Sequence, residues 1–288
     1  MIPDPGTGRW WRALAITAYV AAALVNCTRA NGDAHGDRIV TIGGPVTEIV
    51  FALGAGPRVV AVDTSSVYPD AAMRLPQVGY QRTLAAEGIL AQRPALVIAG
   101  ADAGPPAVLE QLRAAGVRVE LVANAQAPET AAARIEAVGR LIGAEPRAHA
   151  LAAQVLAETR AARASLPAGS PRAIAIYARG AGTLLVAGGD TTAGAMLGLA
   201  GATNAATGFT GYKPLSAEAL IAAAPDVIVV PARGLATIGG EAGLLALPGV
   251  AQTPAGRARK IVALDDLELL GFGPRLGHSI AELARRMR

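Results

Sequence analysis

A segment from the first half of the chain returns in the second half. Residues 79–99 read GYQRTLAAEGILAQRPALVIA, and residues 211–230 read GYKPLSAEALIAAAPDVIVV. Each copy begins with Gly-Tyr, continues into a short helical pattern with a glutamate in its first turn, and reaches a proline followed by an apolar run. A proline ends the helix before it, and such an apolar run is typical of a buried parallel strand. One supersecondary unit used twice predicts two similar lobes.

Length and composition agree with a two-lobed globular protein. The chain has 288 residues, of which 52% are hydrophobic and 17% charged, so it can bury two ordinary cores. Its formal charge is only +4, its Lys and Arg residues do not gather into runs, and its aromatic content is 3%. Nucleic-acid binding requires a basic stripe and, for single strands, stacking platforms, so we expect no nucleic-acid partner.

The N-terminus carries an export signal. Two arginines precede an uncharged stretch over residues 13–25, which has the length of a secretory signal core and is too short to span a bilayer. Cys27, the only cysteine, ends a segment that resembles a lipoprotein box. Lipidation at Cys27 and ordinary cleavage after Ala30 or Ala34 are both open. Either route leaves a mature protein without a disulfide or a thiol nucleophile.

Strands and helices alternate through both halves of the chain. In the first half we predict strands at residues 38–43, 59–62, 95–99 and 118–122 and helices at 45–53 and 105–115; in the second half we predict strands at 173–177, 183–186, 227–230 and 260–264 and helices at 192–199 and from 276. Long Ala-rich helices are expected at 129–141 and 146–166. Right-handed crossovers fold such alternation into parallel sheets flanked by helices.

The predicted fold class is therefore α/β, with two Rossmann-like lobes joined by a long rigid helix. We expect a signal peptide and leader over residues 1–36, an N-terminal lobe over 37–143, an interlobe helix over 144–166 and a C-terminal lobe over 167–288. Parallel sheets carry their functional loops at the carboxyl ends of strands, so the ligand is expected in a cleft between the lobes. Loops that carry Tyr80, Arg179 and Arg275 are placed to face this cleft.

Catalytic and metal-binding motifs are missing from the sequence. It has no phosphate-binding Gly-x-x-x-x-Gly-Lys-Ser/Thr loop, no Gly-x-Ser-x-Gly elbow and no His, Cys or carboxylate cluster at metal-site spacing. The three histidines lie in the leader, on the interlobe helix and on the last helix, where surface roles are expected. We predict that the protein is not an enzyme.

Tyr80 and Arg82 are the best ligand-binding candidates. A phenol has a pKa near ~10 and binds ferric iron as phenolate, a ligation used for haem iron, and a guanidinium two residues further on in an extended loop would stabilise that anion. From these residues alone, a structural tyrosine at the domain edge with Arg82 in solvent remains the alternative.

Glu87 and Glu218 occupy equivalent places in the two copies. A carboxylate in the first turn of a helix is stabilised by the exposed N–H groups by roughly 0.3 to 1 kcal/mol, which explains each residue without any function. The functional interpretation is that one carboxylate per lobe forms a two-point pattern for the basic sockets of a dimeric partner.

Four segments together resemble a known family. They are IGGPVTEI at residues 42–49, GYQRTL at 79–84, GYKPLS at 211–216 and LLGFGPR at 269–275. With the export signal and the repeated unit, they are similar to substrate-binding proteins of ABC importers for iron chelates, cobalamin and haem, and in particular to the haem-binding, HmuT-type branch. The resemblance runs from about Arg38 to the C-terminus.

This resemblance implies a class III periplasmic binding protein that captures ferric haem as a transported ligand. It implies Tyr80 as the axial ligand of the haem iron and Arg82 as its hydrogen-bonding support. Arg179 and Arg275 are further haem-binding candidates, while Glu87 and Glu218 would dock the permease. Some relatives carry a histidine where this chain has Arg179, and an arginine does not ligate iron. We therefore expect one haem per chain.

The expected function is haem and iron uptake: a periplasmic protein hands haem to an inner-membrane ABC permease dimer with its ATPase, downstream of an outer-membrane haem receptor. The nearest alternative is the same architecture with a ferric siderophore or cobalamin. An enzyme on a chelatase-like two-lobe fold would need a cleft base that the sequence lacks, and an adhesion protein would leave the repeated glutamate unit unexplained.

Overall fold

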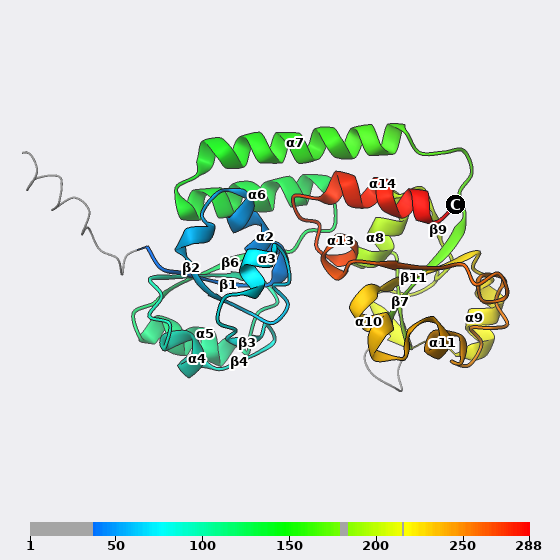
Figure 1. The fold of residues 1–288 in the computed structure, drawn as a ribbon, viewed down its shortest axis with the longest axis horizontal. Coiled ribbons are helices and arrows are strands. Elements are labelled where there is room, and N and C mark those ends of the chain that lie inside the picture. Colours follow the sequence, from blue (N-terminus) through cyan, green and yellow to red (C-terminus); the bar gives the residue numbers. More distant parts are fainter. Residues whose placement is uncertain (1–36, 179–183, 215) are drawn as a thin grey trace, which may run out of the picture.

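Two parallel sheets lie side by side, and a long helix runs along one side of both (Figure 1). The computed structural model describes residues 37–178, 184–214 and 216–288. The predicted export signal, Cys27 and Arg179 lie outside the described residues. We call the part built on the first sheet lobe one and the part built on the second sheet lobe two.

Lobe one has a four-stranded parallel sheet in the order β2-β1-β5-β6. These strands are β1 (Ile39–Ile42), β2 (Val59–Val62), β5 (Leu96–Gly100) and β6 (Arg118–Val122). Their side chains alternate between the faces: Ile39 packs with α2 (Gly44–Ala52) and α6 (Pro128–Ile142), and Val40 packs with α4 (Ala86–Leu90) and α5 (Pro106–Ala114). Both faces are covered, as the apolar runs predict.

Lobe two repeats this arrangement and adds to it. Its parallel strands follow the order β9-β7-β11-β12, which are β7 (Arg172–Ala178), β9 (Thr203–Asn204), β11 (Val227–Pro231) and β12 (Ile261–Leu264). Two antiparallel strands, β8 (Leu184–Ala187) and β10 (Tyr212–Pro214), extend β7. Helix α8 (Thr192–Leu199) covers one face, and α9 (Ala217–Ala223) lies on the other.

The repeated segment occupies equivalent positions in the two lobes. Strands β5 and β11 are both fully buried inner strands, and each is preceded by its short helix, α4 or α9. The glycine before each tyrosine has a positive φ, +100° at Gly79 and +72° at Gly211, a conformation that side chains disfavour. The predicted two-lobe α/β fold is confirmed.

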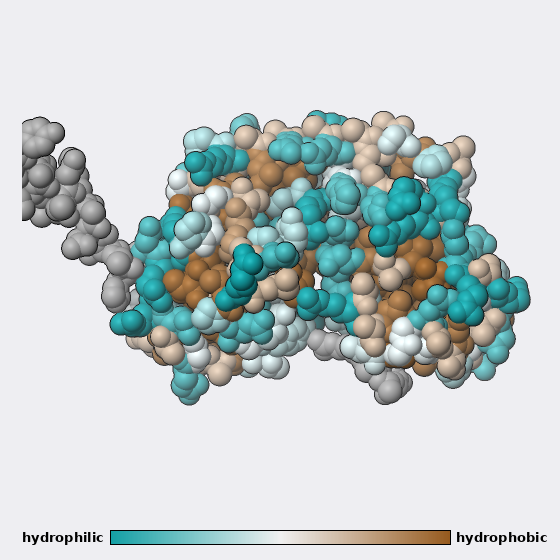
Figure 2. All heavy atoms as spheres, in the orientation of Figure 1, coloured by the Kyte–Doolittle hydropathy of each residue, from teal (hydrophilic) through white to brown (hydrophobic). Residues whose placement is uncertain are grey.

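Helix α7 (Glu145–Ala164) packs against α6 and against the C-terminal helix α14 (Leu276–Arg286), and Figure 1 shows it running over both lobes. Beneath it, one apolar core continues from lobe one into lobe two and includes Ile135, Val155, Met196 and Ile280. The opposite face of each sheet has its own separate core. The lobes are thus joined by shared packing on the α7 side, while Figure 2 shows a notch between them at the opposite edge.

Several short elements were not predicted. They are the 3-10 turn Gly56–Arg58, α3 (Asp70–Met73), β3 (Gly79–Tyr80), β4 (Thr83–Leu84), β9, β10, α10 (Ala232–Thr237), α11 (Gly240–Leu245), α12 (Pro254–Arg257) and α13 (Asp266–Leu270). All have six residues or fewer, too short for a helical or strand period to emerge from the sequence. The stretch of residues 63–78, between β2 and β3, begins with the fully buried Asp63.

We predict that Gly139→Ala lowers the free energy of unfolding by about 1–3 kcal/mol, because overpacking a tight contact costs that much. A Cβ at Gly139 on α6 would lie 2.2 Å from the Cβ of Ala148 on α7, so the two helices would have to separate. Chemical denaturation measures the change.

The matched control is Gly198→Ala, on α8. That position is exposed and has no neighbour within 4 Å of an added Cβ, so the higher helix propensity of alanine should raise stability by up to about 1 kcal/mol. Equal effects of the two substitutions would contradict the tight α6–α7 contact.

Candidate ligand-binding site

Tyr80 lies on a hairpin at one edge of lobe one. Strands β3 and β4 pair antiparallel, with Tyr80 opposite Thr83, so that Gln81 and Arg82 form the two-residue turn. The extended loop expected around Arg82 is thus a tight turn, and Tyr80 is half-buried beside it.

Loops that follow two strands of the sheet anchor this hairpin. The Thr64 N–H, just after β2, donates to the Gly79 carbonyl at 2.9 Å. Gly104, after β5, donates its N–H to the Gln81 carbonyl at 2.8 Å and accepts from the Leu84 N–H at 3.0 Å. The hairpin therefore sits at the carboxyl edge of the sheet, where parallel sheets place their sites.

A buried carboxylate holds the neighbouring loops. Asp63 accepts hydrogen bonds from the Gly43 N–H at 2.8 Å, from the Ser65 N–H and hydroxyl at 2.9 and 2.6 Å, and from the Ser66 hydroxyl at 2.6 Å. With four donors on its two oxygens, the carboxylate is well compensated for its burial. It ties the loop after β1 to the loop after β2.

Arg82 lies among an acid and two phenols. Its guanidinium donates to Asp102 at 2.7 Å, and the Arg82 side chain is 57% exposed. The hydrogen bond that Arg82 donates to Asp102 is the largest cause that raises the pKa of Arg82, and the phenols of Tyr80 and Tyr177 act in the same direction. Tyr177 belongs to lobe two, so this cluster spans the two lobes.

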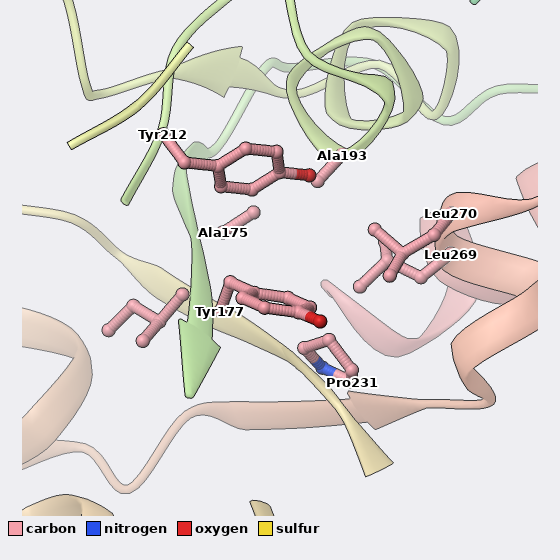
Figure 3. A pocket seen from close by; sticks show the side chains of 8 residues that line it. Ala175, Tyr177, Ala193, Tyr212, Pro231, Leu269 and Leu270 are labelled. Atoms are coloured by element: carbon pink, nitrogen blue, oxygen red, sulfur yellow. The ribbon is translucent and has the colours of Figure 1, made fainter. Parts of the chain in front are cut away.

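Lobe two contributes an aromatic wall. The rings of Tyr177 on β7 and Tyr212 on β10 lie 5.6 Å apart between centroids, inclined at 54°, within the favourable range for aromatic pairs. Together they line a shallow apolar hollow, shown in Figure 3. The other lining residues are Ala175, Ile176, Ala193, Pro231, Leu269 and Leu270.

Sequence reasoning did not name Tyr177 or Tyr212 as site residues. Tyr212 carried a signal, because Gly211-Tyr212 copies Gly79-Tyr80. Tyr177 carried none beyond its place at the end of a predicted strand, and only the fold brings it near Arg82.

Arg275 is already occupied by protein groups. It donates to Glu48 at 2.9 and 3.3 Å and to Glu268 at 2.7 Å, lies 3.6 Å from Asp265, and stacks its guanidinium 3.9 Å from the centre of the Tyr68 ring. Its expected contact with the ligand stays a prediction, as does that of Arg179, which lies outside the described residues.

Glu87 and Glu218 are exposed residues in the first turns of α4 and α9. The backbone N–H of Glu218 and then the Ser216 hydroxyl hold the pKa of Glu218 below its usual value, so it stays ionised. Ser216 also caps α9, accepting from the Ala219 N–H at 3.2 Å, whereas Ala85 at the start of α4 offers no side-chain cap. Docking through the two glutamates stays a prediction.

Among residues 37–178, 184–214 and 216–288, no group of three or more His, Cys, Asp or Glu side chains is placed to hold a metal ion. In the same described part of the chain, no helix is long and apolar enough to cross a membrane. What the arrangement offers is a phenol and a guanidinium on lobe one and an apolar aromatic wall on lobe two.

Two parallel-sheet lobes joined by a long helix, with candidate ligand groups at the ends of their strands, define a bilobal substrate-binding protein. The family model for periplasmic binding proteins matches residues 39–267, and the chain belongs to this family. Members of this family are ligand-carrying parts of transport systems and not enzymes.

Two solved structures are similar over nearly the whole fold. The periplasmic heme-binding protein RhuT from Roseiflexus sp. RS-1, in apo form, is 46% identical with a TM-score of 0.85, over 88% of this chain and 98% of that one. The periplasmic heme-binding protein BhuT, in complex with two hemes, is 46% identical with a TM-score of 0.81, over 87% and 97%. An uncharacterized ABC transporter substrate-binding lipoprotein, YvrC of Bacillus subtilis (strain 168), is 28% identical over 86% of this chain and 78% of its own length.

We predict that Asp102→Asn changes the free energy of unfolding by no more than about 1 kcal/mol, because exposed ion pairs contribute about that much or less. Urea denaturation followed by circular dichroism measures the change.

Asp63→Ala serves as the comparison. It removes the buried acceptor of four hydrogen bonds and should cost about 3 kcal/mol or more. A loss above about 2 kcal/mol in Asp102→Asn would show that the Arg82 pair is structural.

Proposed function

We propose that this protein captures ferric haem between its two lobes and delivers it to an inner-membrane ABC permease for haem and iron uptake. One observation carries the proposal: Tyr80 and Arg82 share an anchored hairpin in lobe one, and Arg82 interacts electrostatically with Tyr177 of lobe two. The chain that holds this arrangement is 46% identical to two structures described as heme-binding proteins.

In this proposal Tyr80 ligates the haem iron through its phenolate oxygen. A free phenol ionises only near pH ~10, so a neighbouring cation is needed to favour the anion at neutral pH. Arg82 supplies that cation, and giving up its exposed contact with Asp102 costs little. The Tyr177–Tyr212 wall then packs against the apolar face of the porphyrin.

The cellular location and the protein partners are proposed in less detail than the ligand. The family is extracytoplasmic, and we place this chain in the periplasm, with a lipid anchor on Cys27 as the finer proposal. We take the permease to be a dimer with its ATPase. An outer-membrane haem receptor supplies the haem that this protein captures. We propose lobe limits of 37–143 and 167–288, joined by the helix within 144–166.

Glu87 and Glu218 are proposed to dock the permease, one from each lobe. Both are exposed at helix starts in equivalent copies of the repeated unit. Charged contacts at the rim of an interface fix register and speed association, and they weaken with salt. Two such contacts, one per lobe, suit a partner with two equivalent basic sockets.

The alternative ligands are a ferric siderophore and cobalamin, carried by the same architecture. The phenol and guanidinium on one hairpin favour an iron centre that accepts a phenolate ligand, which haem offers. A Soret band on addition of hemin separates haem from both alternatives.

We predict that Tyr80→Phe removes the phenolate-to-iron charge-transfer band of the hemin complex and leaves the fold intact, because the ring stays and only the ligating oxygen is lost. In the wild type, absorbance titration with hemin should show a high-spin, five-coordinate complex and one break at one equivalent per chain.

Tyr212→Phe is the matched control, since it removes a phenol from the facing wall and should keep the band. If Tyr80→Phe leaves the spectrum unchanged, Tyr80 is not the iron ligand. A break at two equivalents would refute the single-haem site.

We also predict that Glu87→Ala combined with Glu218→Ala keeps hemin affinity near the wild-type value but reduces permease-stimulated ATP hydrolysis in reconstituted vesicles, since the charges act only in docking. Each single substitution should have a milder effect than the pair.

Glu129→Ala combined with Glu145→Ala provides the matched control. Both are exposed carboxylates in the first turns of α6 and α7, away from the predicted docking sites. If the variant with Glu87→Ala and Glu218→Ala transports haem normally, or loses haem without any permease, the docking assignment is wrong. Stabilisation of the two helix starts then remains the explanation of both glutamates.

A further inference from the structure

The two lobes meet where α13 of lobe two approaches the start of α2 of lobe one; Figure 1 shows α13 between the lobes. The approach is close. A Cβ at Gly44 on α2 would lie 2.3 Å from the Leu267 side chain and 2.7 Å from the Ser65 carbonyl, and a Cβ at Gly273 would lie 3.2 Å from the Glu48 carboxylate. Glycine at these positions lets the lobes touch.

A buried ion pair crosses this junction. Glu48 on α2 is 4% exposed and accepts two hydrogen bonds from Arg275, at 2.9 and 3.3 Å. The Arg275 side chain is 23% exposed, with Glu268 bonded on one side and the ring of Tyr68, from lobe one, stacked over it. Burial raises the pKa of Glu48, and the bonds from Arg275 act in the opposite direction. Each charge therefore depends on its partner across the lobes.

A second arginine holds the same segment from α6. Arg134 is 5% exposed, and its guanidinium donates to the carbonyls of Gly271 at 2.5 Å and Phe272 at 2.8 Å. Burial lowers the pKa of Arg134 to about 10, while Glu48 acts to raise it. Phe272 has a φ of +49°, a conformation that non-glycine residues rarely adopt without support from their surroundings. The segment after α13 is thus clamped onto lobe one by two guanidinium groups, the buried one of Arg134 and the partly buried one of Arg275.

The same helix, α13, reaches the candidate site. Leu267 contacts the Gly44 side of the junction, and Leu269 and Leu270 line the hollow beside Tyr177. Any movement of α13 relative to lobe one would therefore move part of the lining of this hollow, next to Tyr177.

We propose that Glu48, Arg275 and Arg134 form an interlobe latch that holds the lobes at one separation, and that they set how long haem is retained without touching it. The inference rests on the proposed function for its ligand but not for its geometry. Arg275 becomes a positioning residue in this proposal and not a haem contact. Removing one partner of a buried pair leaves an uncompensated charge, whereas replacing both with neutral residues of similar size keeps the packing.

The test measures lobe separation directly. Spin labels at Gln111→Cys on α5 and Thr237→Cys on α10, both exposed and in different lobes, report the distance between lobes in a Cys27→Ser background. Arg275→Met should broaden the distance distribution of the ligand-free protein. It should also speed hemin transfer to apomyoglobin by about 5-fold or more, the lower end of typical coupling between sites. The absorbance spectrum of the bound hemin should be unchanged.

Further variants keep the test decisive if Arg275→Met does not fold. Glu48→Gln and Glu268→Gln with Arg275→Met removes Arg275 together with both carboxylates that accept its hydrogen bonds, and should shift the distance while preserving the fold. Gly44→Ala should separate the junction with no change of charge. Glu110→Gln with Arg113→Met, an exposed ion pair within lobe one, is the control and should change neither readout.

The outcomes separate the latch from its alternatives. Faster hemin loss with an unchanged distance in the ligand-free protein would mean that Arg275 contacts haem, and would overturn the latch. Unchanged distance and unchanged hemin loss would also overturn it. If wild-type protein fails to bind hemin, the proposed function fails, while the distance measurement still decides the latch.

Discussion

The shared core beneath α7 is the constraint on which the molecule depends. Packing interactions from α6, α7 and α14 cover one face of both sheets, so neither lobe can bury that face without the other. Buried apolar area contributes roughly 25 cal/mol per Å², and an interior packed at crystal-like density resists sliding. The lobes are thus fixed along one side, and only the opposite side, where the strands end, is left for a ligand.

Within that constraint, the two copies of the repeated segment contribute different groups to the candidate site. The two copies present Tyr80 and Tyr212 after glycines with positive φ, but the surroundings differ. In lobe one the tyrosine lies on an anchored hairpin that is not part of the main sheet and has an arginine in its turn. In lobe two the tyrosine lies on a strand added to the main sheet and pairs its ring with Tyr177. One unit thus carries a phenol beside a guanidinium, and the other contributes to an apolar wall.

Local patterns predicted the lobes, the long helix and the strand-helix alternation because periodicity and proline positions are properties of adjacent residues. The same reasoning reached Tyr80 and Arg82, whose role toward haem stays a prediction. It could not reveal the surroundings of Arg275, because its partner Glu48 lies 227 positions away and only the fold brings them together. Nor could it find Tyr177 in the site, or the short helices from α10 to α12, where glycines and prolines conceal any helical period.

The internal repeat also affects how often an encounter between this protein and the proposed permease is productive. A homodimeric acceptor with two equal sockets cannot tell the two lobes apart by their glutamates alone, since α4 and α9 present the same group from equivalent places. In the docking proposed above, the carrier can therefore bind in either of two poses related by a half-turn. Two productive poses in place of one would double the share of productive collisions, a gain that arises from symmetry and requires no additional contact.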